Sequence, residues 1–179
     1  MKTIDGTYFF CYNNRKNSQK FIEENIIPIL SKDIKIVFLD GKIVKSNFEQ
    51  KYISKTKQEK TEVWNSTLTG PAGQIYSTVE DLYKYYIGLR DYKIVSKEAF
   101  KKATTPYLSG YGYGWFIDDL YGKKLINHGG NIEGSTSYFA MLPEDDLCII
   151  LLNNITSKKL EKAGNTILAE LLGQAYTHP

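Results

Sequence analysis

The alternation of apolar and polar positions divides the first part of the chain into three segments. Residues 17–30 have apolar positions at helical spacing, which predicts an amphipathic helix. Residues 34–44 alternate between apolar and polar and are split by Asp40-Gly41, a pair typical of a tight hairpin turn. Residues 48–71 are polar and lysine-rich without a clear period, so we expect a long loop or linker there.

The second part has a sharper pattern and predicts three helices. Ser77 and Glu80 form a capping box, in which the Ser77 hydroxyl accepts from the Glu80 amide and a helix begins. A short helix begins at Ser96 and ends before Pro106. The last helix begins at Thr156 and carries one continuous apolar stripe.

Four strands are predicted between these helices, over residues 111–116, 123–127, 135–142 and 147–152. The last of them is apolar throughout, so we expect it to be covered on both faces. The order of elements predicts an α+β fold, in which an antiparallel sheet is flanked by helices. The helix from Thr156 is expected to pack on one face of this sheet, because its apolar stripe needs a partner.

Composition and charge exclude several classes of protein. The chain has 179 residues, 42% of them hydrophobic, which suits one domain with its own core. No apolar run is long enough for a membrane span, and the first residues lack the apolar block of a signal peptide. The net charge of +3 is mild and only Arg15 and Arg90 are arginines, so we do not expect nucleic-acid binding. The two cysteines and two histidines match no metal-ligand spacing, and we expect neither a metal nor a cofactor.

The segment around His128 has the strongest chemical signal. His128 follows a predicted strand, and Gly129, Gly130 and Gly134 come directly after it. Glycines leave a strand surface bare, so a ligand can approach the backbone closely. A backbone amide at such a strand edge can stabilise a developing oxyanion. The alternative is a glycine-rich turn beside a surface histidine.

An ordered series of motifs lies within residues 70–173, the range over which the chain resembles a known family. It comprises residues 70–82, Tyr111-Gly112-Tyr113-Gly114-Trp115, His128-Gly129-Gly130 with Gly134, Leu142-Pro143, and residues 151–154. Together these motifs resemble the C-terminal half of the serine β-lactamase and penicillin-binding-protein superfamily. Within it, they are most similar to class C β-lactamase-related esterases and D-alanyl peptidases. The resemblance implies a partial serine β-lactamase-like fold.

The same resemblance implies roles for four residues. The segment like His128-Gly129-Gly130 is the third catalytic motif of that superfamily, and the residue aligned with Asn131 offers an oxyanion-hole amide. The residue aligned with His128 helps to bind a substrate carboxylate or to relay protons. Such enzymes hydrolyse a β-lactam, a D-Ala-D-Ala-type amide or a small ester through a covalent acyl-enzyme.

The superfamily also needs a serine nucleophile with a lysine in S-x-x-K, and a Tyr-x-Asn on a separate helical lobe. The S-x-x-K of this chain runs from Ser54 to Lys57 in the lysine-rich stretch, without the period of a buried helix, so we expect it not to be catalytic. Tyr12 and Asn14 form a Tyr-x-Asn. Alternatively, residues 34–44 correspond to the superfamily's first hairpin, and the helical lobe is deleted. The two alignments exclude each other, and both stay open.

We therefore predict two parts. Residues 1–60 form an N-terminal helix-hairpin segment with a polar linker, and residues 61–179 form the β-lactamase-like portion. The expected function is that of a truncated or degenerate serine hydrolase domain that is inactive alone. The alternatives are a non-catalytic binding or regulatory module and one half of a two-chain hydrolase. We expect self-association or a partner chain to cover the sheet edge beside His128. The compartment stays open, although the superfamily usually works outside the cytoplasm.

Overall fold

A computed structural model describes residue 75 and residues 77–132, 134–154 and 156–176, together with the backbone of residues 7–12 and 34–38. The predicted helix over residues 17–30, the Asp40-Gly41 turn and the loop over residues 48–71 lie outside the described residues. The division of the chain near residue 60 stays a prediction.

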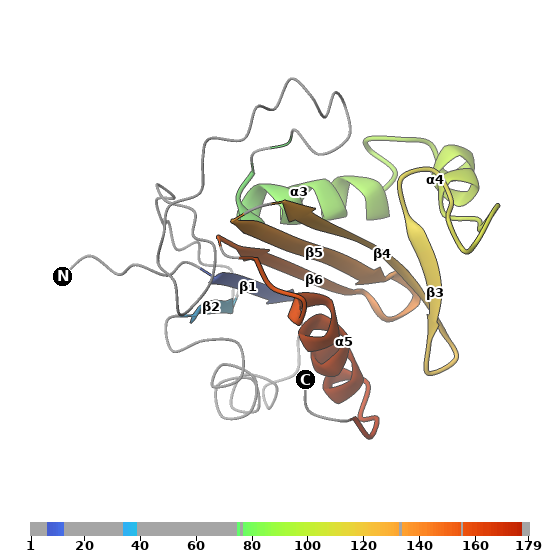
Figure 1. Cartoon of the computed structure of the whole chain (residues 1–179). Coiled ribbons are helices and arrows are strands. Elements are labelled where there is room, and N and C mark those ends of the chain that lie inside the picture. Colours follow the sequence, from blue (N-terminus) through green and yellow to red (C-terminus); the bar gives the residue numbers. More distant parts are fainter. Residues whose placement is uncertain are drawn as a thin grey trace.

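Within the described residues, six strands form one sheet in the order β2-β1-β6-β5-β4-β3 (Figure 1). The four C-terminal strands are antiparallel neighbours: β3 Phe116–Leu120, β4 Lys123–Ile132, β5 Ser135–Leu142 and β6 Leu147–Asn153. The last three strands and their antiparallel arrangement were predicted, whereas a strand over the range of β3 was not. The first strand, β1 (Thr7–Tyr12), continues the sheet antiparallel to β6. The outermost strand, β2 (Ile34–Phe38), pairs parallel to β1.

Helices cover both faces of this sheet. Figure 1 shows α3 (Val79–Arg90) on one face and α5 (Leu160–Leu171) on the other, with α4 (Lys97–Ala103) beside β3. Successive residues of β6 point alternately into two apolar clusters, one under each helix. The expected cover on both faces of the apolar strand is therefore confirmed, as is the packing of the last helix on the sheet. No helix in the described ranges has the length and apolar character that a bilayer span requires.

Two of the three predicted helix starts are displaced. The first helix is capped by Thr78 rather than Ser77, because the Thr78 hydroxyl accepts from the Asp81 amide at 3.2 Å. The last helix begins at Leu160 rather than Thr156, whose hydroxyl instead accepts from the Gly134 amide at 3.0 Å. The cap at Ser96 is confirmed.

The prediction of a strand over residues 111–116 is wrong, because this segment is folded into turns before β3 begins. Ser109 and Gly110 both have positive φ and close a tight hairpin between Leu108 and Tyr111. A Cβ on Gly112 would lie 2.1 Å from the Ala103 carbonyl oxygen, so the loop lies directly against the end of α4. The glycines mark close approach and turning here rather than the interior of a strand.

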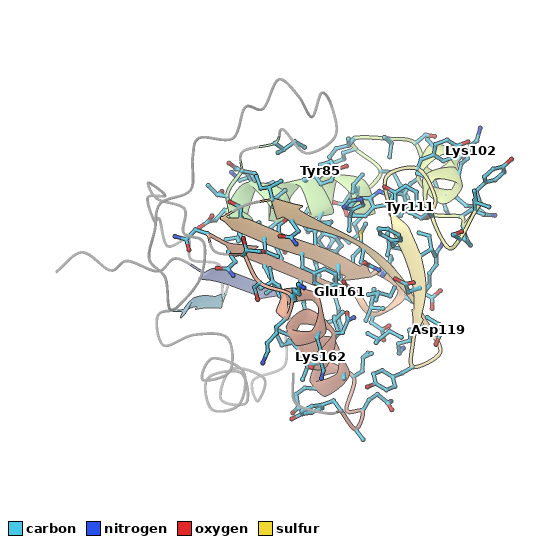
Figure 2. All side chains as sticks on the ribbon, viewed as in Figure 1. Tyr85, Lys102, Tyr111, Asp119, Glu161 and Lys162 are labelled. Atoms are coloured by element: carbon cyan, nitrogen blue, oxygen red, sulfur yellow. The ribbon has the colours of Figure 1, made fainter. Side chains whose placement is uncertain are left out.

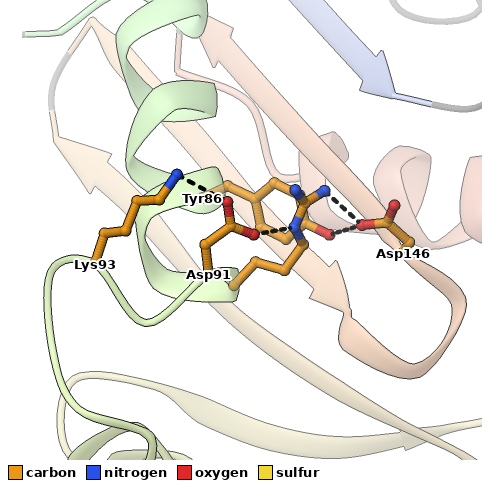
Figure 3. A network of polar contacts seen from close by, with 5 residues as sticks. Tyr86, Asp91, Lys93 and Asp146 are labelled. Atoms are coloured by element: carbon orange, nitrogen blue, oxygen red, sulfur yellow. Dashed lines mark hydrogen bonds and ion pairs between the residues drawn. The ribbon is translucent and has the colours of Figure 1, made fainter.

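A polar network joins the C-terminal end of α3 to the turn between β5 and β6 (Figure 3). The buried Tyr86 hydroxyl donates to Asp146 at 2.9 Å, and the Arg90 guanidinium reaches the same carboxylate at 3.1 Å. Arg90 also bonds Asp91, which lowers the pKa of that carboxyl, while burial and the bond to Asp146 raise the pKa of Tyr86. The turn that ends at Asp146, a residue with φ of 51°, is thereby tied to the helix.

Candidate functional site

The predicted motif lies inside a strand rather than after one. The strand expected over residues 123–127 continues to Ile132, so His128, Gly129, Gly130 and Asn131 all belong to β4. Strand β3 pairs with β4 only as far as Asn127, whereas β5 pairs with it from residue 126 to residue 132. From His128 onward, one edge of β4 therefore has no strand partner within the part of the chain that the structure describes.

The register shows which backbone groups face this uncovered edge. The Ile117 amide donates to the Gly110 carbonyl at 2.7 Å, away from β4, so Ile117 and Ile126 form a non-hydrogen-bonded pair. Backbone groups alternate along a strand, and the amide and carbonyl of Gly129 and Asn131 therefore point to the uncovered edge.

The edge is also accessible. Gly129, Gly130 and Asn131 are exposed, in contrast to the buried residues of β4 that precede His128. A Cβ at Gly130 would lie 2.5 Å from the Ser137 hydroxyl oxygen, so the Ser137 side chain takes the space that a side chain at residue 130 would need. Two successive positions without side chains leave bare backbone beside the half-buried His128 ring.

An aromatic cluster holds His128 at the point where β3 leaves β4. The Tyr111 hydroxyl lies 3.0 Å from His128 Nε2, and His128 Nδ1 lies 2.7 Å from the Gly129 carbonyl oxygen. The Phe116 ring contacts both other rings, with centroid distances of 4.6 Å to Tyr111 and 5.6 Å to His128. Tyr111 comes from the loop between α4 and β3 (Figure 2).

Further aromatic side chains form the wall on the α3 side of the sheet. Phe139 lies opposite His128 on β5. The centroid of the Phe139 ring lies 5.4 Å from that of Trp115 and 6.4 Å from that of Tyr85 in α3. Burial raises the pKa of Tyr85. The contact between Tyr111 and His128 was not expected from the sequence. The Ser109-Gly110 pair was a turn signal that could have placed Tyr111 at a hairpin end.

The other predicted site residues are not brought together with β4. The backbone of Tyr12 ends β1 opposite Cys148, so β6 and β5 separate it from β4. Asn14, Ser54 and Lys57 lie outside the described residues. The hypotheses on Tyr-x-Asn and on S-x-x-K therefore stay predictions. The described residues hold no group of three or more His, Cys, Asp or Glu side chains that could bind a metal ion.

Solved structures with similar folds come from one superfamily. The octameric penicillin-binding protein homologue from Pyrococcus abyssi is 33% identical over 55% of this chain and 25% of its own, with a TM-score of 0.52. A D-stereospecific amidohydrolase from a Streptomyces species is 25% identical over 71% of this chain and 40% of its own, with a TM-score of 0.57. A class C β-lactamase shares the fold at 19% identity and a TM-score of 0.56, over 72% of this chain and 44% of its own.

This chain thus spans less than half the length of each of these proteins. No curated protein matches it. The Beta-lactamase family model matches residues 40–173, which include β4 with its uncovered edge. The chain therefore belongs to the β-lactamase family, within the superfamily of serine β-lactamases and penicillin-binding proteins.

Proposed function

We propose that the uncovered edge of β4 is the sheet wall of an acyl-transfer active site. The observation that carries this proposal is the outward direction of the Gly129 and Asn131 backbone groups, at exposed positions beside His128. The Asn131 amide is the oxyanion donor, and removing one such donor from an acyl-transfer enzyme costs roughly a hundredfold to a thousandfold in rate. The substrate is a β-lactam, a D-Ala-D-Ala-type amide or a small ester.

The geometry supports binding of an extended acyl chain along the edge. Asn131 offers both an amide and a carbonyl in the same direction, which is the pattern that one residue of an antiparallel strand would pair with. The Gly129 carbonyl already accepts from the His128 ring, so the edge offers a ligand the two amides as donors and the Asn131 carbonyl as an acceptor. A substrate carbonyl oxygen would lie at the Asn131 amide.

We also propose that the nucleophile belongs to a helical lobe that these 179 residues do not supply, on the same or another polypeptide. The 179-residue chain by itself is then catalytically silent, because half of a constellation that acts as a unit retains little catalysis. A non-catalytic binding role for the same edge remains the second candidate, favoured by the polar setting of the sequence from Ser54 to Lys57.

An assembly is part of the proposal. The side chains of Tyr107, Leu108 and Tyr113 are 92%, 73% and 65% exposed on the loop that carries Tyr111. Apolar groups gathered on one loop favour contact with a further lobe, a partner chain or a second copy. The octameric state of the Pyrococcus abyssi homologue supports self-association.

The edge is tested by adding a peptide that ends in D-Ala-D-Ala to the nitrogen-15-labelled chain. We expect the amide signals of Gly129 and Asn131 to shift, while those of Gly122 and Gly173, which lie in distant turns, stay unchanged. Equal shifts at all four amides, or none at saturating peptide, would overturn the proposal.

Catalytic silence is tested separately on the same preparation. The chain should neither form an adduct with a labelled penicillin nor release nitrophenol from a short ester above the buffer rate. An adduct that mass spectrometry locates on Ser54 would show that the S-x-x-K from Ser54 to Lys57 is catalytic after all.

A further inference from the structure

The His128 ring is bonded at both of its nitrogens, and this decides where its proton lies. Nδ1 lies 2.7 Å from the Gly129 carbonyl oxygen, which can only accept, so Nδ1 carries a hydrogen. In a neutral imidazole the second nitrogen is then bare. At 3.0 Å from Tyr111, Nε2 therefore accepts the hydrogen bond from the tyrosine hydroxyl.

We infer that Tyr111 is a positioning residue that, together with the Gly129 carbonyl, holds neutral His128 with its hydrogen on Nδ1. Its meaning for catalysis rests on the proposed function, whereas the state of the ring can be measured without any activity. Neutral His128 then has no N–H to offer a ligand. The group that the pair presents to the site is the Tyr111 hydroxyl oxygen, which keeps its acceptor capacity.

The loop around Tyr111 is built to hold this side chain. The Tyr111 amide donates to the Leu108 carbonyl at 2.8 Å, and the Tyr111 carbonyl accepts from the Tyr107 amide at 2.9 Å. Ser109 adopts φ of 50°, a left-handed conformation that is unfavourable for a non-glycine residue and persists only where its surroundings enforce it. The edge-to-face contact with the Phe116 ring holds the Tyr111 ring from its other side.

Protonation of His128 exchanges the roles of the pair. The ring gains its hydrogen at Nε2 and donates it to the Tyr111 oxygen, and the tyrosine O–H is released toward the site as a donor. Among the described residues, Tyr111 is the titratable group bonded to this ring, and Tyr85 of α3 contacts Phe139, the residue that pairs with His128 on β5. The cationic pair thus presents a donor suited to an anionic group, and the neutral pair presents an acceptor.

The inference is tested by nitrogen-15 spectra of the histidine rings in the full chain. His178→Gln leaves His128 as the single histidine and assigns its signals. At a pH where the ring is neutral, we expect Nδ1 to report a bound hydrogen and Nε2 to report a bare nitrogen that accepts a hydrogen bond. A hydrogen on Nε2 in the wild-type chain would overturn the inference, and this reading needs no variant of Tyr111.

Tyr111→Phe then removes one hydroxyl and keeps the ring beside Phe116. We expect the Nε2 signal to move toward that of an unbonded nitrogen, and a second population with the hydrogen on Nε2 to appear. Tyr113→Phe, two residues along the same loop, is the matched control and should leave both ring signals unchanged. Unchanged ring signals in a folded Tyr111→Phe chain would also overturn the inference. A failure of peptide binding with the expected ring signals would count against the proposed function alone.

Discussion

At the scale of single residues, the alternating direction of the backbone amides along β4 predicts that proline is tolerated at Asn131 and not at the neighbouring Gly130. Asn131→Pro removes an amide that faces the uncovered edge, so no ladder bond is lost and we expect a change in unfolding free energy of at most about 1 kcal/mol. Gly130→Pro removes an amide that bonds β5 and leaves the Ser137 carbonyl without its donor, at a cost of about 1–3 kcal/mol or more. Urea denaturation of both variants measures the difference.

Both variants introduce the same residue into the same strand, and at residue 130 the new Cβ also displaces the Ser137 hydroxyl, which lies 2.5 Å from it. Equal destabilisation would contradict the assignment of the Asn131 amide to the open edge. Asn131→Pro should also abolish the shift of the Gly129 amide signal on addition of the peptide, because the Asn131 donor is lost although the Gly129 amide itself is kept.

At the scale of elements, we expect Tyr86→Phe to weaken the attachment of the β5–β6 turn to α3. The Tyr86 ring is 1% exposed and keeps its packing, so the loss is that of one hydrogen bond to a carboxylate. Such a bond contributes about 1 kcal/mol here, because the Asp146 carboxylate is half-exposed and keeps its contact with Arg90. Thermal unfolding measures the change.

Tyr121→Phe is the matched control for that variant. The Tyr121 hydroxyl also makes one hydrogen bond, to the Ala175 carbonyl at 3.0 Å, but the side chain lies on the surface. We expect a smaller loss than for Tyr86→Phe. A larger loss at Tyr121 would mean that the C-terminal contact, and not the network around Asp146, stabilises the molecule more.

The same scale shows which elements a pattern can predict. The strand over residues 135–142 was predicted with both of its ends, because alternation and the turn at Pro143 are local signals. The start of the last helix was displaced, because Thr156 bonds Gly134, twenty-two positions away in sequence. Tyr111-Gly112-Tyr113-Gly114 alternates like a strand, yet contact with Ala103 folds it into turns.

The candidate site was predictable in part for the same reason. The glycines after His128 mark bare backbone in any fold, so the segment could be found from its residues. Which amides face the open edge depends on where β3 stops pairing, and this follows from strand register rather than from composition. The bond between Tyr111 and His128 joins residues seventeen positions apart and needed the hairpin at Ser109 to be known.

At the scale of the whole molecule, we expect the chain to associate. The apolar side chains on the loop of residues 107–113 and the open edge of β4 lie on connected elements, and uncovered edges and apolar patches favour pairing with another chain. A stable specific contact would bury roughly 800 Å² on each partner. Sedimentation over a wide range of protein concentration measures the state of association.

Tyr107→Ser with Leu108→Ser tests which surface is responsible. Both side chains are strongly exposed, so the double variant should fold normally and shift the equilibrium toward the monomer. A wild-type chain that stays monomeric at every concentration would contradict the expectation, as would a double variant that associates like the wild type.

The register of β4 also has an evolutionary consequence. Its first half is paired with β3 and residues 126–132 are paired with β5, so the segment after Asn127 is held in one register. A single-codon insertion or deletion there would turn every following side chain to the opposite face and direct the Asn131 amide into the sheet. Descendants of this gene can therefore lengthen or shorten the segment only by two residues at a time, unless a bulge absorbs the odd one.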